Sequence, residues 1–220
     1  MKRRDFSALL ATTPLAGVAG TALAQGGPLE GRHYQTLNPV LPTTPGKIEV
    51  IEFFWYGCPH CYAFEPTIEA WAKQLPADVS FRKVHVAFRS VVKIHQRMFY
   101  ALEALGKEAQ VRPAVFAALH QQRLPLDDAK SQAEFLAKLG IDATKYQDAY
   151  NSFGVQTKCA QAEKLSEAYK VDGVPMLGIG GRFTTSPSMA GAGQQMPESE
   201  SGKLALQYTD FLIQRIRRKA

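Results

Sequence analysis

The sequence predicts an α/β fold in which one sheet is interrupted by an all-helical insertion. Three observations predict it: β-prone runs at 48–56 and 79–88 flank a helical pattern, residues 91–168 contain no convincing strand, and two short strands with a final helix follow. Because a strand–helix–strand unit takes a right-handed crossover, the first two long strands are expected to lie parallel. The two later strands are expected to rejoin the same sheet.

The first 24 residues are predicted to be a signal peptide and not part of the fold. Lys2–Arg4 supplies a basic n-region, Ala8–Ala19 is mostly small and apolar, and Ala22-Leu23-Ala24 matches an A-x-A cleavage site. The apolar run is too short for a membrane anchor. We therefore expect export to the bacterial periplasm. The Arg3-Arg4 pair resembles a twin-arginine signal, but any basic n-region produces that match, so the export route stays open.

Without residues 1–24 the chain is only mildly basic. That segment holds three basic residues and one acidic residue, so the formal charge falls from +6 to +4 over the remaining 196 residues. The basic residues are dispersed, apart from a group at 215–219 that suits the C-terminal end of a helix. This pattern argues against a nucleic-acid partner. A chain of this length that is 45% hydrophobic can build one domain with an insertion.

The first half of the sheet is predicted from β-propensity and spacing. A short strand is expected at 33–37, and the prolines between residues 38 and 46 predict a loop. The almost unbroken β-prone run at 48–56 is typical of a strand that is covered on both faces. The next segment, 62–75, repeats apolar residues at helical spacing, with a kink expected at Pro66. The alternating run that follows predicts the second long strand.

Helical patterns fill the predicted insertion. Pro113 is expected in the first turn of its second helix, and Ser131 is expected to cap its third. We assign residues 91–168 to a helical insertion domain, and residues 25–90 together with 169–220 to a discontinuous sheet domain. The expected helices cover 90–105, 112–121, 131–139, 142–153 and 155–169.

The end of the chain is predicted to return to the sheet. Two short β-prone segments, 176–179 and 182–185, are separated by Gly180-Gly181, which is a strong hairpin signal. The segment 185–202 is rich in Ser, Gly, Pro and Gln and is expected to form a loop. Leu204–Arg217 repeats apolar residues along one stripe and predicts the final helix.

Two of the three cysteines, Cys58 and Cys61, form a C-x-x-C motif where the buried strand turns into the first helix. Gly57 is expected to permit the tight turn, and Pro59 suits the first helical position because its missing N–H costs nothing there. A helix N-terminus stabilises a thiolate and lowers the pKa of Cys58, and a protonated His60 would add to that effect. Cys61 lies one helical turn on, is expected to face inward, and is the natural disulfide partner.

Other uses of the motif agree less well with the sequence. A C-x-x-C pair can be half of a zinc site, but three cysteines cannot supply four ligands, and the remaining histidines form no H-x(3–5)-H pair. Two incidental core cysteines are disfavoured because Pro and His between them fill a core poorly. Redox chemistry is therefore the preferred interpretation. Cys159 is expected to be a small buried residue of a helix, with a regulatory or intermolecular disulfide as the alternative.

A strand–helix–strand unit with C-x-x-C at the helix start, followed by a β-hairpin and a final helix, resembles the thioredoxin fold. The helical insertion, Cys-Pro-His-Cys at 58–61, Glu-Phe-Phe at 52–54 and the predicted signal peptide make the chain closely similar to the DsbA family of periplasmic thiol oxidases. The similarity extends from His33 to the last helix. It implies a thioredoxin-like fold with an inserted helical domain.

The resemblance also implies roles for further residues. Val174-Pro175 matches the family's cis-proline, which faces the active-site cysteines and leaves the Val174 backbone free to pair with an extended substrate. Glu52 corresponds to the family's buried acid and Lys83 to its basic partner. A carboxylate buried near Cys61 would have a raised pKa and could relay a proton. From the residues alone, either side chain could instead face solvent.

The function implied by the resemblance is that of a thiol:disulfide oxidoreductase, which introduces disulfide bonds into newly exported proteins through Cys58 and Cys61. Trp55, Tyr56, Tyr62 and the residues near Pro175 are expected to contribute to an apolar, loosely specific substrate groove. A DsbB-like, quinone-linked membrane protein would reoxidise the enzyme, no dissociable cofactor is needed, and a monomer is expected. A disulfide reductase or isomerase is the alternative, followed by a C-x-x-C metal-binding chaperone.

Overall fold

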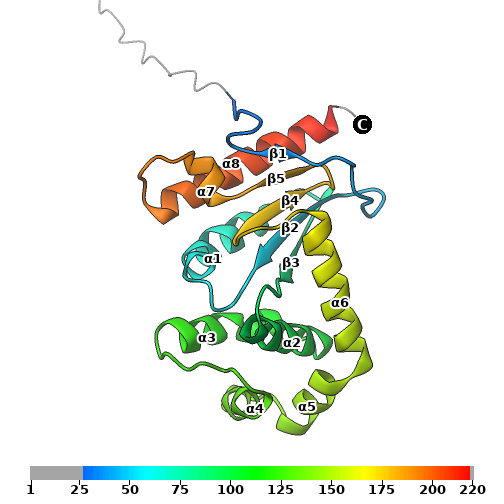
Figure 1. The fold of residues 1–220 in the computed structure, drawn as a ribbon, viewed down its shortest axis with the longest axis vertical. Coiled ribbons are helices and arrows are strands. Elements are labelled where there is room, and N and C mark those ends of the chain that lie inside the picture. The colour runs from blue at the N-terminus through cyan, green and yellow to red at the C-terminus, as the bar shows by residue number, and fades with distance from the viewer. Residues whose placement is uncertain (1–26, 219–220) are drawn as a thin grey trace, which may run out of the picture.

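The computed structural model describes residues 27–218, with a sheet half and a helical half that lie one above the other in Figure 1. The predicted signal peptide at 1–24 lies outside the described residues. Within them, a five-stranded mixed sheet has the strand order β1-β5-β4-β2-β3. Its strands are β1 (Gln35–Thr36), β2 (Ile48–Phe54), β3 (Val79–His85), β4 (Met176–Ile179) and β5 (Phe183–Thr185).

Helices account for most of the remaining described residues. Five of them, α2–α6, follow one another between β3 and β4, where the sequence predicts the insertion (Figure 1). The predicted α/β architecture with an inserted helical block is therefore confirmed, while the division into 25–90 with 169–220 and 91–168 stays a prediction. The helices are α1 (Pro59–Ala72), α2 (Ser90–Ala104), α3 (Glu108–His120), α4 (Ala129–Ala137), α5 (Ala143–Asn151), α6 (Phe153–Ala168), α7 (Pro187–Gly191) and α8 (Glu198–Arg217).

The strand pairing includes the parallel pair and the hairpin that the sequence predicts. β2 runs parallel to β3, with Glu52 opposite Lys83, and antiparallel to β4. β4 and β5 form the predicted antiparallel hairpin. β2 ends at Phe54, two residues earlier than expected, because residues 55–57 form the turn that leads into α1.

Different helices cover the two faces of β2. Val50 packs with Phe64 and Ile68 of α1 in a buried cluster that also includes side chains of α8. Successive strand residues point to opposite faces, so Phe53 faces the other way, where it contacts the ring of Tyr169 at the end of α6. Residues 50–54 are all fully buried, which confirms that this strand is covered on both sides. Cys58 therefore follows a strand that is fixed in the core, separated from it only by the turn at 55–57.

Two helix starts in the insertion differ from the prediction. α3 begins at Glu108, so Pro113 lies inside the helix and not in its first turn. Burial of Val111 and the ion pair between Glu108 and Arg112 stabilise this earlier start. α4 is capped by Asp128 and not by Ser131, because the Asp128 carboxylate accepts hydrogen bonds from two backbone N–H groups of the first turn.

The expected loop at 185–202 was wrong in part. Ser186 caps the short helix α7, and Pro187 occupies its first position. α8 begins at Glu198, six residues before the predicted start, and Glu198 with Glu200 places negative charge in its first turn. Negative charge stabilises a helix N-terminus. A composition rich in Ser, Gly and Pro concealed both helix starts because these residues also favour turns.

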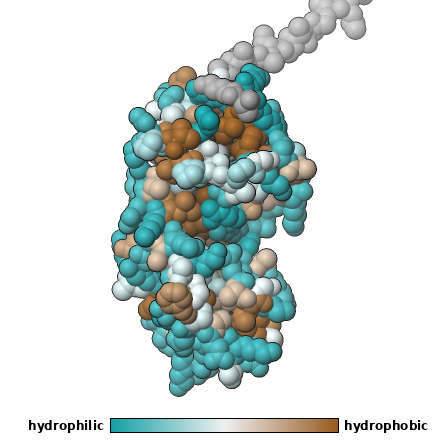
Figure 2. All heavy atoms as spheres, turned by 90° about the vertical axis from the view of Figure 1, so that its right-hand side faces the viewer, coloured by the Kyte–Doolittle hydropathy of each residue, from teal (hydrophilic) through white to brown (hydrophobic). Residues whose placement is uncertain are grey.

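The apolar side chains of the fold are gathered in two buried clusters. One lies between the sheet and the α1 and α8 helices, and the other extends from the opposite face of the sheet into the insertion. Hydrophilic residues cover most of the face drawn in Figure 2, and the apolar patches on it are separate from one another. None of the helices described here is long and apolar enough to cross a membrane.

Candidate active site

Cys58 occupies the N-cap of α1, as the sequence predicts. Its backbone is extended (φ −83°, ψ 118°), Pro59 takes the first helical position, and the N–H of Cys61 donates to the Cys58 sulfur at 3.4 Å. Cys58 is 6% exposed and Cys61 is fully buried, so Cys58 is the accessible sulfur. Both cysteines are free thiols in this structure.

Gly57 is required in the preceding turn for a reason other than the one expected. It does not have a positive φ, so the turn does not depend on backbone freedom. A Cβ at this position would instead lie 2.4 Å from the Trp55 ring. The Trp55 indole is fixed in place because its N–H donates to His95 Nδ1 at 3.0 Å.

The pKa values of the two thiols are shifted in opposite directions. The pKa of Cys58 is lowered to about 6, chiefly by its interaction with the Cys61 thiol. Burial opposes this shift, whereas the backbone N–H groups of Cys61 and His60 favour it and the charge of His60 adds least. Burial, and then the nearby Cys58, raise the pKa of Cys61 well above its usual value. The backbone N–H groups at the start of α1 therefore lower the pKa of Cys58 more than the charge of His60 does.

The Val174-Pro175 segment lies against the active-site sulfur. The peptide bond between these residues is cis. The Cys58 thiol donates a hydrogen bond to the Val174 carbonyl at 3.4 Å. Both residues therefore occupy the position that the resemblance assigns to them.

Glu52 and Lys83 form a buried ion pair below α1. Glu52 is fully buried and Lys83 is 7% exposed, so neither residue faces solvent on its strand. Burial raises the pKa of Glu52 to about 7; the charge of Lys83 opposes this shift and the charge of Glu65 adds to it. Burial also works against the charge of Lys83, but the Glu52 and Glu65 carboxylates outweigh it and raise the pKa of the ammonium group. The Glu52 charge contributes to the raised pKa of Cys61, which puts the acid within electrostatic reach of the sulfur.

His60 lies on the surface of α1 and meets a partner that the sequence did not suggest. Its Nδ1 contacts the carboxylate of Glu198, the first residue of α8, and both side chains are more than half exposed. Glu198 is 138 residues away in the chain, so no local pattern could have linked the two. The pair lies at one end of a cavity beside the cysteines.

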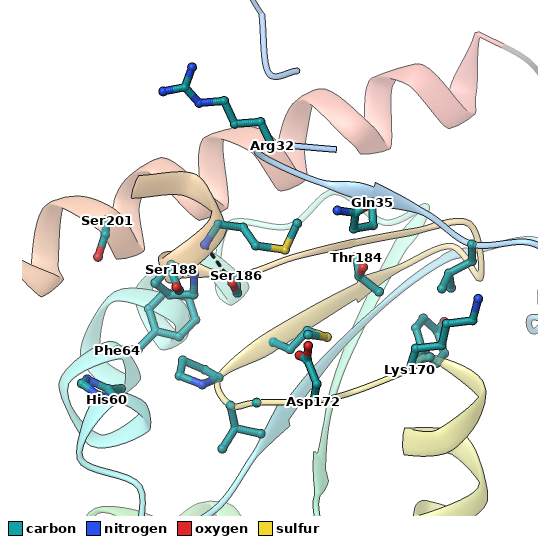
Figure 3. Close-up of a pocket in the computed structure, with 18 of the residues that line it drawn as sticks. Arg32, Gln35, His60, Phe64, Lys170, Asp172, Thr184, Ser186, Ser188 and Ser201 are labelled. Atoms are coloured by element: carbon teal, nitrogen blue, oxygen red, sulfur yellow. Dashed lines mark hydrogen bonds between the residues drawn. The ribbon is translucent and has the colours of Figure 1, made fainter. Parts of the chain in front are cut away.

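This cavity has a volume of about 910 Å³ and runs along the Val174-Pro175 segment. Figure 3 shows His60 and Phe64 of α1 at one end and Lys170 at the other, with Asp172 between them. Its wall also includes hydroxyl groups from Thr184, Ser186, Ser188 and Ser201. It therefore offers both polar and apolar contacts beside the Val174-Pro175 segment.

Residues near Pro175 line this cavity, as expected of the groove. Tyr56 was wrong as a groove residue because it is fully buried. Trp55 and Tyr62 are half-buried outside the cavity lining, and their part in a substrate groove stays a prediction. The insertion holds Tyr56 and Tyr62: the Tyr56 carbonyl lies 2.7 Å from His120 Nε2, and the Tyr62 ring stacks on the His120 imidazole with a centroid distance of 4.8 Å. These contacts stabilise the turn before Cys58.

Comparison with known proteins agrees with this geometry. The family model described as a DSBA-like thioredoxin domain matches residues 92–200, which include most of the insertion and the hairpin. The thiol:disulfide interchange protein DsbA of Burkholderia cepacia is 41% identical over 221 residues, which cover 100% of this chain and 99% of that protein. The chain belongs to the DsbA family. As a DsbA-family protein it is a disulfide oxidoreductase.

Solved DsbA structures share its fold. The crystal structure of Pseudomonas aeruginosa DsbA has a TM-score of 0.81 and 40% sequence identity, and the match covers 87% of this chain and 95% of that one. The oxidoreductase NmDsbA1 from N. meningitidis has a TM-score of 0.72 at 27% identity, covering 87% of this chain and 95% of that one. The thioredoxin-like fold with an inserted helical domain is therefore shown.

Several residues near this DsbA-type centre were not predicted from the sequence. Glu65 had a usable signal, because it lies one helical turn after Cys61 on α1 and therefore faces the sheet below it. Glu198 and Arg112 had no such signal, since their contacts with α1 depend on how distant helices pack.

Cys159 is partly buried on α6 and not fully buried as expected, and burial raises its pKa to about 11.

Proposed function

We propose that this protein is an oxidase that donates the Cys58–Cys61 disulfide to newly exported proteins. The observation that supports it most is the contrast between its two thiols. The pKa of Cys58 is lowered to about 6, whereas that of Cys61 is raised well above its usual value. A stable thiolate favours the reduced form of the enzyme, and a couple whose reduced form is favoured is oxidising.

The reaction has two exchange steps. A substrate thiolate attacks Cys58, the bond between Cys58 and Cys61 breaks, and its electron pair leaves with the Cys61 sulfur. A second substrate thiolate then attacks the substrate sulfur of the mixed disulfide and releases Cys58 as a thiolate. The substrate loses two electrons and gains a disulfide, and the enzyme is left as the dithiol.

The buried acid completes this scheme. Because the pKa of Cys61 is raised, its sulfur takes up a proton as it leaves. Glu52, with a pKa of about 7, can supply that proton at neutral pH and recover it later. Lys83 holds the Glu52 carboxylate in place through their ion pair. Val174 offers its backbone to the substrate once the Cys58 thiol no longer occupies its carbonyl.

The cavity and the resemblance to the DsbA family support the proposed partners. Extended, cysteine-containing segments of unfolded exported proteins fit the cavity that runs along Val174-Pro175. A DsbB-like, quinone-linked membrane protein reoxidises the dithiol in the bacterial periplasm, and the oxidoreductase works as a monomer with no dissociable cofactor. The signal peptide at 1–24 delivers it there.

The standard potential of the Cys58–Cys61 couple tests this function. Protein is equilibrated in glutathione buffers of graded ratio, quenched with acid, and assayed for free thiols. We expect the couple to be more oxidising than glutathione, so that it is reduced even where oxidised glutathione predominates. A couple more reducing than glutathione would assign the protein to the reductases instead. A parallel assay with reduced, unfolded ribonuclease should show regain of its activity.

A further inference from the structure

A cluster of charged side chains lies under the C-x-x-C helix, where β2 and β3 meet α1 and α3. Lys83 contacts the Glu52 carboxylate, the Glu65 carboxylate at 2.8 Å and the Glu69 carboxylate at 3.4 Å. Apart from Glu69, whose side chain is 36% exposed, every member is largely buried. The members are Glu52, Glu65, Glu69, Glu108, Lys83 and Arg112.

Arg112 reaches this cluster from the helical insertion and binds three of its carboxylates. Its Nη1 lies 2.6 Å from Glu69 and 3.2 Å from Glu65, and its Nε donates to Glu108 at 2.8 Å. Glu108 in turn accepts a hydrogen bond from the Tyr56 hydroxyl at 2.7 Å, in the turn before Cys58. One guanidinium therefore connects the insertion to both the turn that precedes the motif and the helix that follows it.

The charges of the cluster do not balance. Four carboxylates face two cations, so full ionisation would leave an excess of two negative charges in a largely buried site, which is costly. Glu52 is the most deeply buried carboxyl, and its Oε1 has no hydrogen-bond partner among the residues that the structure describes. Arg112 shares with Lys83 the neutralisation of Glu65 and Glu69. Without Arg112, Lys83 would be left to neutralise these two carboxylates and Glu52 with a single positive charge.

We propose that Arg112 is a positioning residue of the redox centre, whose guanidinium neutralises Glu65 and Glu69 so that Glu52 can both release and recover the proton that Cys61 requires. In the part of the chain that the structure describes, the Arg112 guanidinium hydrogen-bonds to carboxylates and to neither sulfur. It acts through the charge balance around Glu52, which faces Lys83 from β3, Glu65 and Cys61 from α1, and the Arg112 charge from α3. The inference rests on the proton-donor role proposed above for Glu52.

The step on which Arg112 acts is the departure of Cys61. When a thiolate attacks Cys58, the disulfide electron pair moves to the Cys61 sulfur, and the proton of the Glu52 carboxyl moves to that sulfur. Glu52 is left as a carboxylate beside Lys83, and it regains a proton from water in the next turnover. If Glu52 could not ionise, the Cys61 thiolate would leave without its proton donor.

The test is the pH profile of this step, with reduced glutathione as the attacking thiol. The rate of reduction of the oxidised protein is measured from pH 5 to 9 and divided by the glutathione thiolate concentration at each pH. We expect the normalised wild-type rate to fall as the pH rises, because Glu52 loses the proton that it donates. The inflection should lie near the pKa of Glu52, about 7. Arg112→Gln should move that inflection upward by about one pH unit, equivalent to a tenfold change in the acid dissociation constant.

Three further variants separate a charge effect from a loss of structure. Arg112→Lys keeps the positive charge and should restore the wild-type inflection in large part. Glu69→Gln removes one negative charge from the most exposed member of the cluster and should move the inflection downward, opposite to Arg112→Gln. Lys93→Gln breaks the exposed pair with Glu163 elsewhere in the insertion and should leave the profile unchanged.

Each outcome decides the proposal. If Arg112→Gln lowers the free energy of unfolding but leaves the inflection in place, Arg112 is a structural residue and the inference is wrong. If Arg112→Gln does not fold, Glu69→Gln provides the test. The inference is wrong if the inflection of Glu69→Gln lies at the same pH as that of the wild type or higher. An inflection that persists in Glu52→Gln would instead refute the proton-donor role of Glu52, while the potential of the couple tests the oxidase function separately.

Discussion

The thiol of Cys58 donates a hydrogen bond to the carbonyl of Val174 at 3.4 Å, across 116 residues of sequence. The N-terminal end of α1 and the segment before β4 thus form one site, although five helices of the insertion separate them in the chain. The contact requires a protonated thiol. An ionised Cys58 loses this donor but keeps the N–H of Cys61, so the sulfur exchanges a bond to the substrate-binding segment for bonds to its own helix.

The first prediction concerns the acidity of Cys58. Its pKa of about 6 means that most of the reduced protein carries a thiolate at pH 7. Thiolate absorbance at 240 nm, followed from pH 3 to 9 in the reduced protein and corrected with the oxidised protein, should show a transition centred near pH 6. A transition at the usual thiol value of 9 would show that the Cys61 thiol and the backbone N–H groups of α1 do not lower the Cys58 pKa.

A second prediction extends this shift to stability. The folded pKa of Cys58 lies below its unfolded value of 9, so ionisation stabilises the reduced protein fully above pH 9, and this stabilisation is lost as the pH falls through 6. Between these limits the reduced protein should gain about 1.4 kcal/mol of unfolding free energy per pH unit, relative to a Cys58→Ser control. Urea unfolding of both proteins at pH 5, 6, 7 and 8 measures it. Parallel curves for the two proteins would refute the linkage.

A third prediction separates the roles of the two cysteines. Cys58→Ser should abolish disulfide transfer to reduced ribonuclease because Cys58 is the accessible sulfur. When it is incubated with a substrate that already carries a disulfide, Cys61→Ser should accumulate mixed disulfides. Cys58 attacks one sulfur of that disulfide, the other sulfur leaves as a thiolate, and the enzyme thiol that would resolve the adduct is gone. Non-reducing gel electrophoresis and mass spectrometry detect these adducts. Transfer activity that survives in Cys58→Ser would reverse the assignment.

A fourth prediction divides the contribution of His60 into charge and backbone. His60→Gln removes the charge of His60, the smallest of the causes of the low Cys58 pKa, and keeps the backbone N–H, so it should raise that pKa by a fraction of a unit. His60→Pro also removes a backbone N–H that favours the thiolate and should raise it further, on the order of one unit. The potential should become more reducing in the same order, by about 30 mV for each tenfold change in the equilibrium constant. Equal shifts in the two variants would show that the N–H plays no part.

A fifth prediction tests the turn before Cys58. In Gly57→Ala the new Cβ would lie 2.4 Å from the Trp55 ring, so the ring must move and its hydrogen bond to His95 is strained. We expect a loss of about 1–3 kcal/mol in unfolding free energy and a change in tryptophan fluorescence. Gly154→Ala is the matched control, because its Cβ would meet only the Ser152 hydroxyl at 3.9 Å. Equal stability of the two variants would show that the Gly57 contact is unimportant.

Some features of the site were predictable because they depend on neighbours in the chain. Pro59 after Cys58 specifies a helix start, and the spacing of Cys61 places it one turn further on the inner face. Glu52 was placed by resemblance, and its burial follows from the apolar residues on either side of it in β2. The prediction that Tyr56 lines the groove was wrong for the opposite reason. Aromatic residues beside a motif can be either surface or core, and contacts from α3 decided that Tyr56 belongs to the core.

The sequence by itself determined the strand–turn–helix that presents Cys58, the order of sheet, insertion and hairpin, and the family, because each depends on local propensity, spacing or motif. Only the tertiary structure decided what surrounds the sulfur. Packing of α8 on α1 brings Glu198 to His60, and packing of α3 brings Arg112 to Glu65. Such contacts join residues that are far apart in the chain. Charge and burial then set the acidities on which the chemistry depends, and these quantities exist only once the helices have packed.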